Sequence, residues 1–133
     1  MLLTKIWFDK GRIYGLTNEG KTVWQSLLWY KRLNAATEEQ RNDYEIDDEG
    51  IHWYALDEDI SFKSFEYDDP EPQGISRVFL THPELNASAV ARRIGISQSL
   101  MAQYINGIKK PSKEREQLIL NEVKAIGQEL VAL

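Results

Sequence analysis

The chain has 133 residues, of which 42% are hydrophobic and 28% are charged. These fractions are typical of a folded globular protein and exclude a largely disordered chain. The absence of cysteine excludes disulfide frameworks, thiolate zinc sites and cysteine nucleophiles. No apolar run reaches membrane-spanning length, and the first residues are too short for a signal peptide. We therefore expect a cytoplasmic protein with no membrane contact.

The net charge of −5 is distributed unevenly along the chain. Residues 1–73 carry eight basic and sixteen acidic side chains, a net charge of −8, whereas residues 74–133 carry eight and five, a net charge of +3. The length accommodates two small domains, and the asymmetry indicates that they have different partners.

The first half, residues 1–69, is predicted to be a small α+β domain. Three short runs of bulky residues, separated by turns that end in glycine, predict an antiparallel meander of three strands. Thr37 and Gln40 match a capping box at the start of a helix. Further short strands are expected at residues 44–46 and 51–53.

A linker is predicted at residues 70–74, where two prolines and a glycine follow an acidic run. Residues 75–133 are then predicted to form an all-helical domain. Asn86 and Ser97 are N-cap candidates for two short helices, and Ser112 opens a long last helix.

The two short helices have the pattern of a DNA-reading unit. Gly95 permits a tight turn between them, and Met101 and Tyr104 provide the second helix with a buried face. The side chains on its opposite face that we expect to contact base edges are Gln98, Ser99 and Gln103. Basic side chains near the ends of the two helices are predicted to contact phosphates; they are Arg93, Lys109 and Lys110.

The stretch 89–112 resembles the helix-turn-helix of the Xre/Cro (lambda repressor-like) family. The matching residues are Ala91, Gly95, Ile96, Ser97, Tyr104, Asn106, Gly107, Lys109, Pro111 and Ser112. The resemblance implies a small helical bundle that binds operator DNA, usually as a dimer. The alternative is a helical bundle that packs against another protein.

The last helix carries an apolar stripe at alternating intervals of four and three residues. Its members are Ile119, Val123, Ile126, Leu130 and Leu133. The stripe either closes the core of its own domain or forms the interface of a homodimer. A dimer would predict a palindromic DNA site.

The first domain resembles a small bacterial domain family of unknown function, family 2442, over residues 2–65. The matching segments are 6–9, 11–17, 33–41 and 50–61. Members of that family often stand beside small toxin-like proteins, which implies an antitoxin-like role and a small basic toxin-like protein as partner.

Catalysis is considered only because His52 lies close to the acidic residues 57–59. We expect instead a hydrogen-bonded histidine on a strand, with no enzymatic activity, metal or cofactor. The tryptophans are expected in the core, and the acidic runs 45–49 and 66–71 on solvent faces. They could also attract a basic protein or repel DNA.

The sequence thus predicts a sequence-specific DNA-binding protein that regulates transcription in a bacterium and contacts double-stranded DNA. The alternative is an antitoxin-like interaction protein whose acidic first domain binds a partner, with autoregulatory DNA binding.

Overall fold

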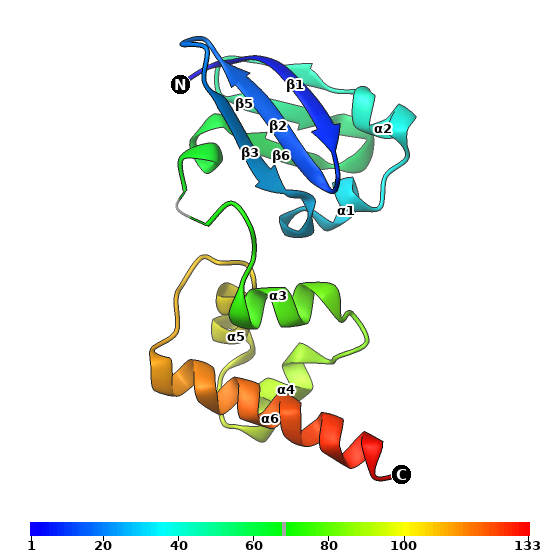
Figure 1. Cartoon of the computed structure of the whole chain (residues 1–133), viewed down its shortest axis with the longest axis vertical. Coiled ribbons are helices and arrows are strands. Elements are labelled where there is room, and N and C mark those ends of the chain that lie inside the picture. The colour runs from blue at the N-terminus through cyan, green and yellow to red at the C-terminus, as the bar shows by residue number, and fades with distance from the viewer. Residues whose placement is uncertain (68) are drawn as a thin grey trace. The chain divides into compact units, whose positions relative to one another are not determined.

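A computed structural model of the chain describes residues 1–67 and 69–133, which divide into two compact units, Met1–Glu71 and Pro72–Leu133 (Figure 1). Each unit has its own hydrophobic core. Asp68, a member of the acidic run predicted at 66–71, lies outside the described residues. The predicted α+β class is confirmed, with two small antiparallel sheets in the first unit.

The first unit begins with the predicted meander, which the structure confirms. Its strands are β1 (Leu3–Asp9), β2 (Arg12–Thr17) and β3 (Thr22–Ser26). They pair antiparallel in the order β1-β2-β3. Between β1 and β2, Lys10 and Gly11 both have positive φ, of 48° and 75°. Two residues of positive φ form a type I′ turn, whose twist matches that of the two strands in a tight hairpin.

A second sheet follows two short helices in the first unit. The helices are α1 (Lys31–Asn34) and α2 (Glu38–Asn42), and the strands are β4 (Glu45–Ile46), β5 (Gly50–Trp53) and β6 (Glu58–Ser61). The strands pair antiparallel in the order β4-β5-β6. Single 3-10 turns occupy Leu27–Trp29, Tyr54–Leu56 and Phe62–Glu66. The predicted capping box of α2 is present, with Thr37 and Gln40 each accepting a main-chain hydrogen bond of the other.

The core of the first unit lies between the two sheets, which overlie each other in Figure 1. Ile6 and Ile13 come from the first sheet, and Ile51, Trp53 and Ile60 come from the second. Trp53 is fully buried, and its indole N–H donates to a carbonyl of α2 at 2.8 Å. Its apolar area and its satisfied donor make it the anchor of this core.

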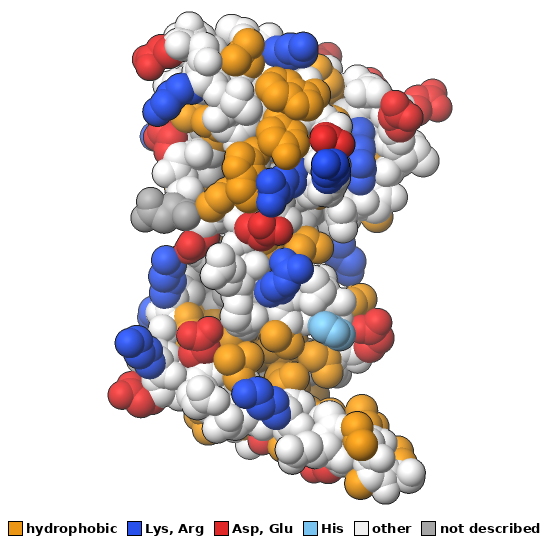
Figure 2. Space-filling model, viewed as in Figure 1, with side chains coloured by type: hydrophobic (Ala, Val, Ile, Leu, Met, Phe, Trp, Pro, Cys, Tyr) orange, Lys and Arg blue, Asp and Glu red, His pale blue; other side chains and the backbone are white. Residues whose placement is uncertain are grey.

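Trp7, Trp24 and Trp29 lie outside that core, so the prediction that the tryptophans are core residues is confirmed for Trp53 and wrong for the other three. Trp7 and Trp24 are paired with Tyr14 in one row across the outer face of the first sheet. The Trp7 and Tyr14 rings stack at 5.6 Å, and the Arg12 guanidinium lies 3.8 Å from the Trp24 ring centre. Figure 2 shows hydrophobic side chains gathered on this face with basic ones among them.

The second unit consists of four helices. They are α3 (Gly74–Thr81), α4 (Ala87–Arg93), α5 (Gln98–Ile105) and α6 (Lys113–Val131). The predicted caps are confirmed, because the side chains of Asn86, Ser97 and Ser112 each accept a main-chain N–H in the first turn of the helix that follows. Each such cap satisfies a donor that the helix itself leaves unpaired.

The segment 70–74, predicted as a linker, has contacts of its own. The carbonyl of Pro70 accepts hydrogen bonds from the main chain of Ser26 and from the indole of Trp29, at 2.7 and 3.2 Å. Glu71 pairs with Arg12 at 3.3 Å. The end of the first unit is therefore held against the first sheet.

Candidate functional site

The turn between α4 and α5 is fixed by three local features. Gly95 has a positive φ of 74°, which a residue with a side chain rarely adopts. The next residue, Ile96, is buried, and its main-chain N–H donates to Ala91 at 2.9 Å. Ser97 then caps α5. The turn is thus anchored in the core of the second unit, and α5 has a defined starting point.

Helix α5 has one buried face and one exposed face. Met101 and Tyr104 are buried in the core of the second unit. The exposed face carries Gln98, Ser99, Ala102 and Gln103. No hydrogen bond joins the side chain of Gln98, Ser99 or Gln103 to any residue that the structure describes. The three predicted base-reading side chains therefore share one solvent-facing surface, which we call the α5 face.

The end of α5 places lysines next to this face. Gly107 has a positive φ of 74°, and the carbonyl of Gln103 accepts main-chain hydrogen bonds from Ile108 and Lys109, at 2.9 and 3.3 Å. This turn folds the chain back onto the last turn of α5. Lys109 and Lys110 are both exposed. The structure thus brings the predicted lysines beside Gln103.

A buried serine, which the sequence analysis missed, also positions α5. The Ser76 hydroxyl on α3 donates to the carbonyl of Tyr104 at 3.0 Å. The same carbonyl, in the last turn of α5, also accepts the main-chain N–H of Gly107 at 3.2 Å, so Ser76 adds a second hydrogen bond that ties the end of α5 to α3. Only the small, polar side chain at a buried position of α3 could have indicated this contact.

Arg93, the third predicted phosphate contact, is engaged elsewhere within the second unit. Its guanidinium lies 2.8 Å from Glu122 and 3.7 Å from Glu129. The two carboxylates of α6 offset its charge, which reduces its attraction for a phosphate. Arg93 is thus paired with α6, whereas Lys109 follows the end of α5 beside Gln103.

The apolar stripe of α6 divides along its length. Ile119 is completely buried, and Val123 and Ile126 pack against the same core. Leu130 is 62% exposed and Leu133 is 98% exposed. The stripe therefore closes the core of its own unit at its beginning and leaves apolar side chains uncovered at its end.

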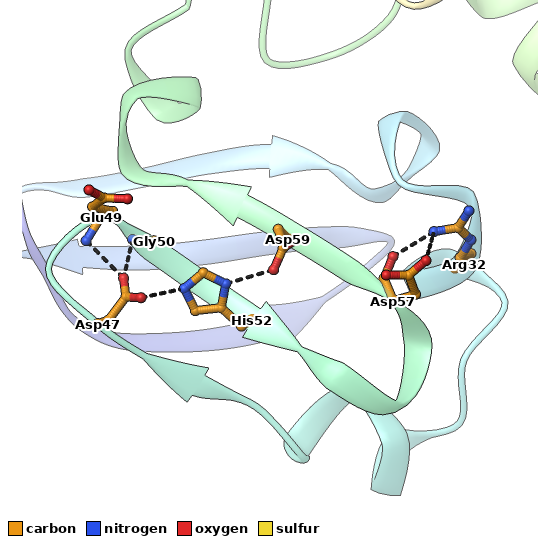
Figure 3. Close-up of polar contacts among 7 residues, drawn as sticks. All are labelled: Arg32, Asp47, Glu49, Gly50, His52, Asp57 and Asp59. Carbon is orange, nitrogen blue, oxygen red and sulfur yellow. Dashed lines mark hydrogen bonds and ion pairs between the residues drawn. The ribbon is translucent and has the colours of Figure 1, made fainter.

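The first unit contains a second polar cluster, around His52 on β5 (Figure 3). One ring nitrogen lies 2.6 Å from Asp59 on β6, and the other lies 2.6 Å from Asp47 after β4. Asp47 also accepts the main-chain N–H groups of Glu49 and Gly50. The imidazole therefore links all three strands of the second sheet.

The two carboxylates raise the pKa of His52 above its ordinary value, because Asp59 and then Asp47 accept hydrogen bonds from the protonated ring. The main-chain N–H groups of Glu49 and Gly50, together with His52, lower the pKa of Asp47. Both ring nitrogens are engaged, so neither is open to a substrate. The arrangement is suited to holding the strands together rather than to proton transfer.

The predicted hydrogen-bonded histidine on a strand is confirmed. Asp47 was not predicted as its partner, because it belongs to an acidic run interpreted as a solvent face. Asp57, one of the acidic neighbours of His52 in the sequence, pairs instead with Arg32 at 3.7 Å. Within the described part of the chain, no group of three or more histidine, cysteine or carboxylate residues is arranged to hold a metal ion. None of its helices has the length and apolar character needed to cross a membrane.

Comparison with known proteins identifies the first unit. It has the fold of a small domain of two facing antiparallel sheets. The family described as "Protein of unknown function (DUF2442)" matches residues 3–71, about half of the chain, and the protein belongs to this family. The resemblance noted from the sequence is thereby confirmed. No curated protein and no solved structure matches the chain.

Proposed function

We propose that the second unit is a helix-turn-helix module of the Xre/Cro (lambda repressor-like) type that binds double-stranded DNA. The protein then acts as a transcriptional regulator in the bacterial cytoplasm. The observation that carries the proposal is the α5 face, where the side chains of Gln98, Ser99 and Gln103 point to solvent and have no hydrogen-bond partner among the described residues. Glutamine both donates and accepts hydrogen bonds, so it can pair with the edge of adenine in the major groove.

The small side chain of Ala102 supports the same interpretation, because it lets α5 approach the bases closely. Lys109 and Lys110 stand beside the α5 face and would contact a flanking phosphate strand. Residues 72–133 carry eight basic and five acidic side chains, a net charge of +3. A positive unit of this kind is attracted to duplex DNA of any sequence, and the glutamines add the discrimination.

We further propose that the protein binds DNA as a homodimer. The exposed end of α6, with Leu130, Val131 and Leu133, offers apolar surface that a second copy would cover. A two-fold dimer would place its two α5 helices about 34–36 Å apart along the duplex. The DNA site should therefore contain two inverted half-sites.

The proposal is tested by selecting binding sites for the full-length chain from a library of random duplexes. Replacing Gln103→Ala should weaken binding to the selected site by about 1–3 kcal/mol and relax the preferred base at one position in each half-site. Gln117→Ala, an exposed glutamine in the first half of α6, is the matched control and should change nothing. Failure to enrich any sequence, or equal losses in both variants, would contradict the proposal.

A second candidate is an antitoxin-like role, favoured by the charge of the first unit. Residues 31–71 carry four basic and fourteen acidic side chains, a net charge of −10. Such a surface attracts a small basic protein. Co-purification of the product of the adjacent reading frame with the full-length chain would support this role, and recovery of the chain alone would count against it.

A further inference from the structure

The edge of the first sheet at β1 has unpaired main-chain groups. Asp9 and Arg12 flank the two-residue loop of Lys10 and Gly11 and therefore form a hydrogen-bonded pair. Along an antiparallel ladder, hydrogen-bonded pairs alternate with pairs whose main-chain groups point away from each other. The main-chain groups that point toward β2 are therefore those of Lys5, Trp7 and Asp9. The N–H and C=O groups of Ile6 and Phe8 point away from the sheet.

The opposite edge of the sheet supports this assignment. Arg12 on β2 directs its main-chain groups toward β1, so its pairing with Ser26 on β3 is not hydrogen-bonded. The main-chain N–H of Ser26 therefore points away from the sheet. That N–H donates to the carbonyl of Pro70 at 2.7 Å, so the β3 edge is covered at this point. No hydrogen bond to another described residue engages the main-chain groups of Ile6 or Phe8. β1 is thus an open edge, and at seven residues it is a long one.

A groove of about 500 Å³ runs along this edge, between β1 and helix α2. Figure 1 shows α2 beside β1, on the side of the strand away from β2. The residues that line the groove are Ile6, Trp7, Phe8, Asp9, Lys10, Gly11, Glu38, Arg41 and Asn42. Natural sheets usually shield an open edge, because it is a template for pairing with another chain. Here the edge forms one wall of a groove.

The side chains of the groove indicate what kind of segment it fits. Arg41 donates to the carbonyls of Leu33 and Asn34, and no carboxylate of a described residue pairs with it. Its guanidinium lies 5.7 Å from the ring centre of Phe8, inside the groove. A carboxylate on a bound peptide segment would form an ion pair with the Arg41 guanidinium. On the outer side, a residue next to Trp7 would extend the aromatic row of the first sheet.

We infer that the groove binds an extended peptide segment of a partner protein, which joins β1 as a fourth strand. Main-chain hydrogen bonds to Ile6 and Phe8 hold the segment, as in other cases of strand addition. An acidic side chain of the segment pairs with Arg41, and an apolar one covers Trp7. This site lies in the first unit and does not depend on DNA binding by the second.

The probe is a displayed library of random peptides of about eight residues, a length typical of a strand with its flanks. It is selected against the full-length chain. We expect enrichment of β-prone peptides with an acidic residue, and slower hydrogen exchange of the Ile6 and Phe8 amides when such a peptide is bound. Asn42→Trp fills the groove and should weaken binding at least about tenfold. Glu39→Trp, on the same helix but outside the groove, should bind like the unaltered chain.

Three outcomes would overturn the inference. The first is a library that yields no peptide binding better to the unaltered chain than to Asn42→Trp. The second is a bound peptide that leaves the exchange of both amides unchanged. The third is protection of the two amides that rises with protein concentration in the absence of peptide, because a second copy would then occupy the edge. Thermal unfolding of both variants shows whether they remain folded.

Discussion

Two polar regions of this protein, the cluster around His52 in the first unit and the α5 face in the second, use their side chains in opposite ways. In the first unit, His52 is bonded on both sides by carboxylates, and Arg12 is held by Glu71 and stacked on Trp24. In the second unit, the glutamines of α5 point to solvent. A polar group without an internal partner keeps its hydrogen bonds for another molecule. The contrast indicates that the contacts of His52 and Arg12 are structural, whereas the α5 glutamines are the groups available to recognise bases.

The largest effect is expected when the central side chain of one of the two cores is truncated. Trp53→Ala should lower the free energy of unfolding of the first unit by about 3–5 kcal/mol, because it deletes a fully buried indole. All four tryptophans lie in the first unit, so tryptophan fluorescence during urea unfolding reports this unit alone. Tyr67→Ala, at a side chain that is 68% exposed, is the control. A loss below about 1 kcal/mol would contradict the assigned core.

The corresponding change in the second unit is Ile119→Ala. It should destabilise that unit by about 2–5 kcal/mol, since Ile119 is completely buried among α3, α4 and α5 residues. Circular dichroism of the helices follows this transition, while the tryptophan signal should remain unchanged. The neighbouring Leu118→Ala, at a half-exposed position, should have a much smaller effect. Equal effects of the two variants would contradict the position assigned to Ile119 in the core.

The smallest expected effect concerns pH. A histidine whose pKa is raised in the folded state stabilises the fold below its ordinary pKa, and this contribution is lost as pH rises through the raised value. The first unit should therefore lose stability as the pH rises above about 6.5, the ordinary pKa of histidine. His52→Ala should reduce that loss in urea unfolding followed by tryptophan fluorescence.

His82→Ala, in the second unit, serves as the control for this pH experiment. It should leave the pH dependence of the tryptophan signal as it is. An unaltered pH dependence in His52→Ala would show that the histidine–aspartate cluster contributes nothing to stability.

Much of the local structure could be predicted from the sequence, because its signals lie within a few residues of each other. The meander, the capping box of α2 and the caps at Asn86, Ser97 and Ser112 are of this kind. Each depends on a turn or on a hydrogen bond to a near neighbour. The sequence also placed His52 on a strand.

What could not be predicted depends on how distant segments meet. The outward position of Trp7 and Trp24 follows from the strand register, which decides the face that each alternate residue occupies. The ion pairs of Arg93 require the packing of α4 against α6. The division of the α6 stripe depends on how far that helix extends beyond its core, which periodicity alone does not reveal.

DNA reading by α5 is tested most directly by mapping the amide chemical shifts of the full-length chain when a selected duplex is added. The largest changes are expected at Gln98, Ser99, Gln103 and Lys109, and no such changes with a duplex whose half-sites are scrambled. Shifts confined to the first unit, or the same response to both duplexes, would contradict the reading of DNA by α5.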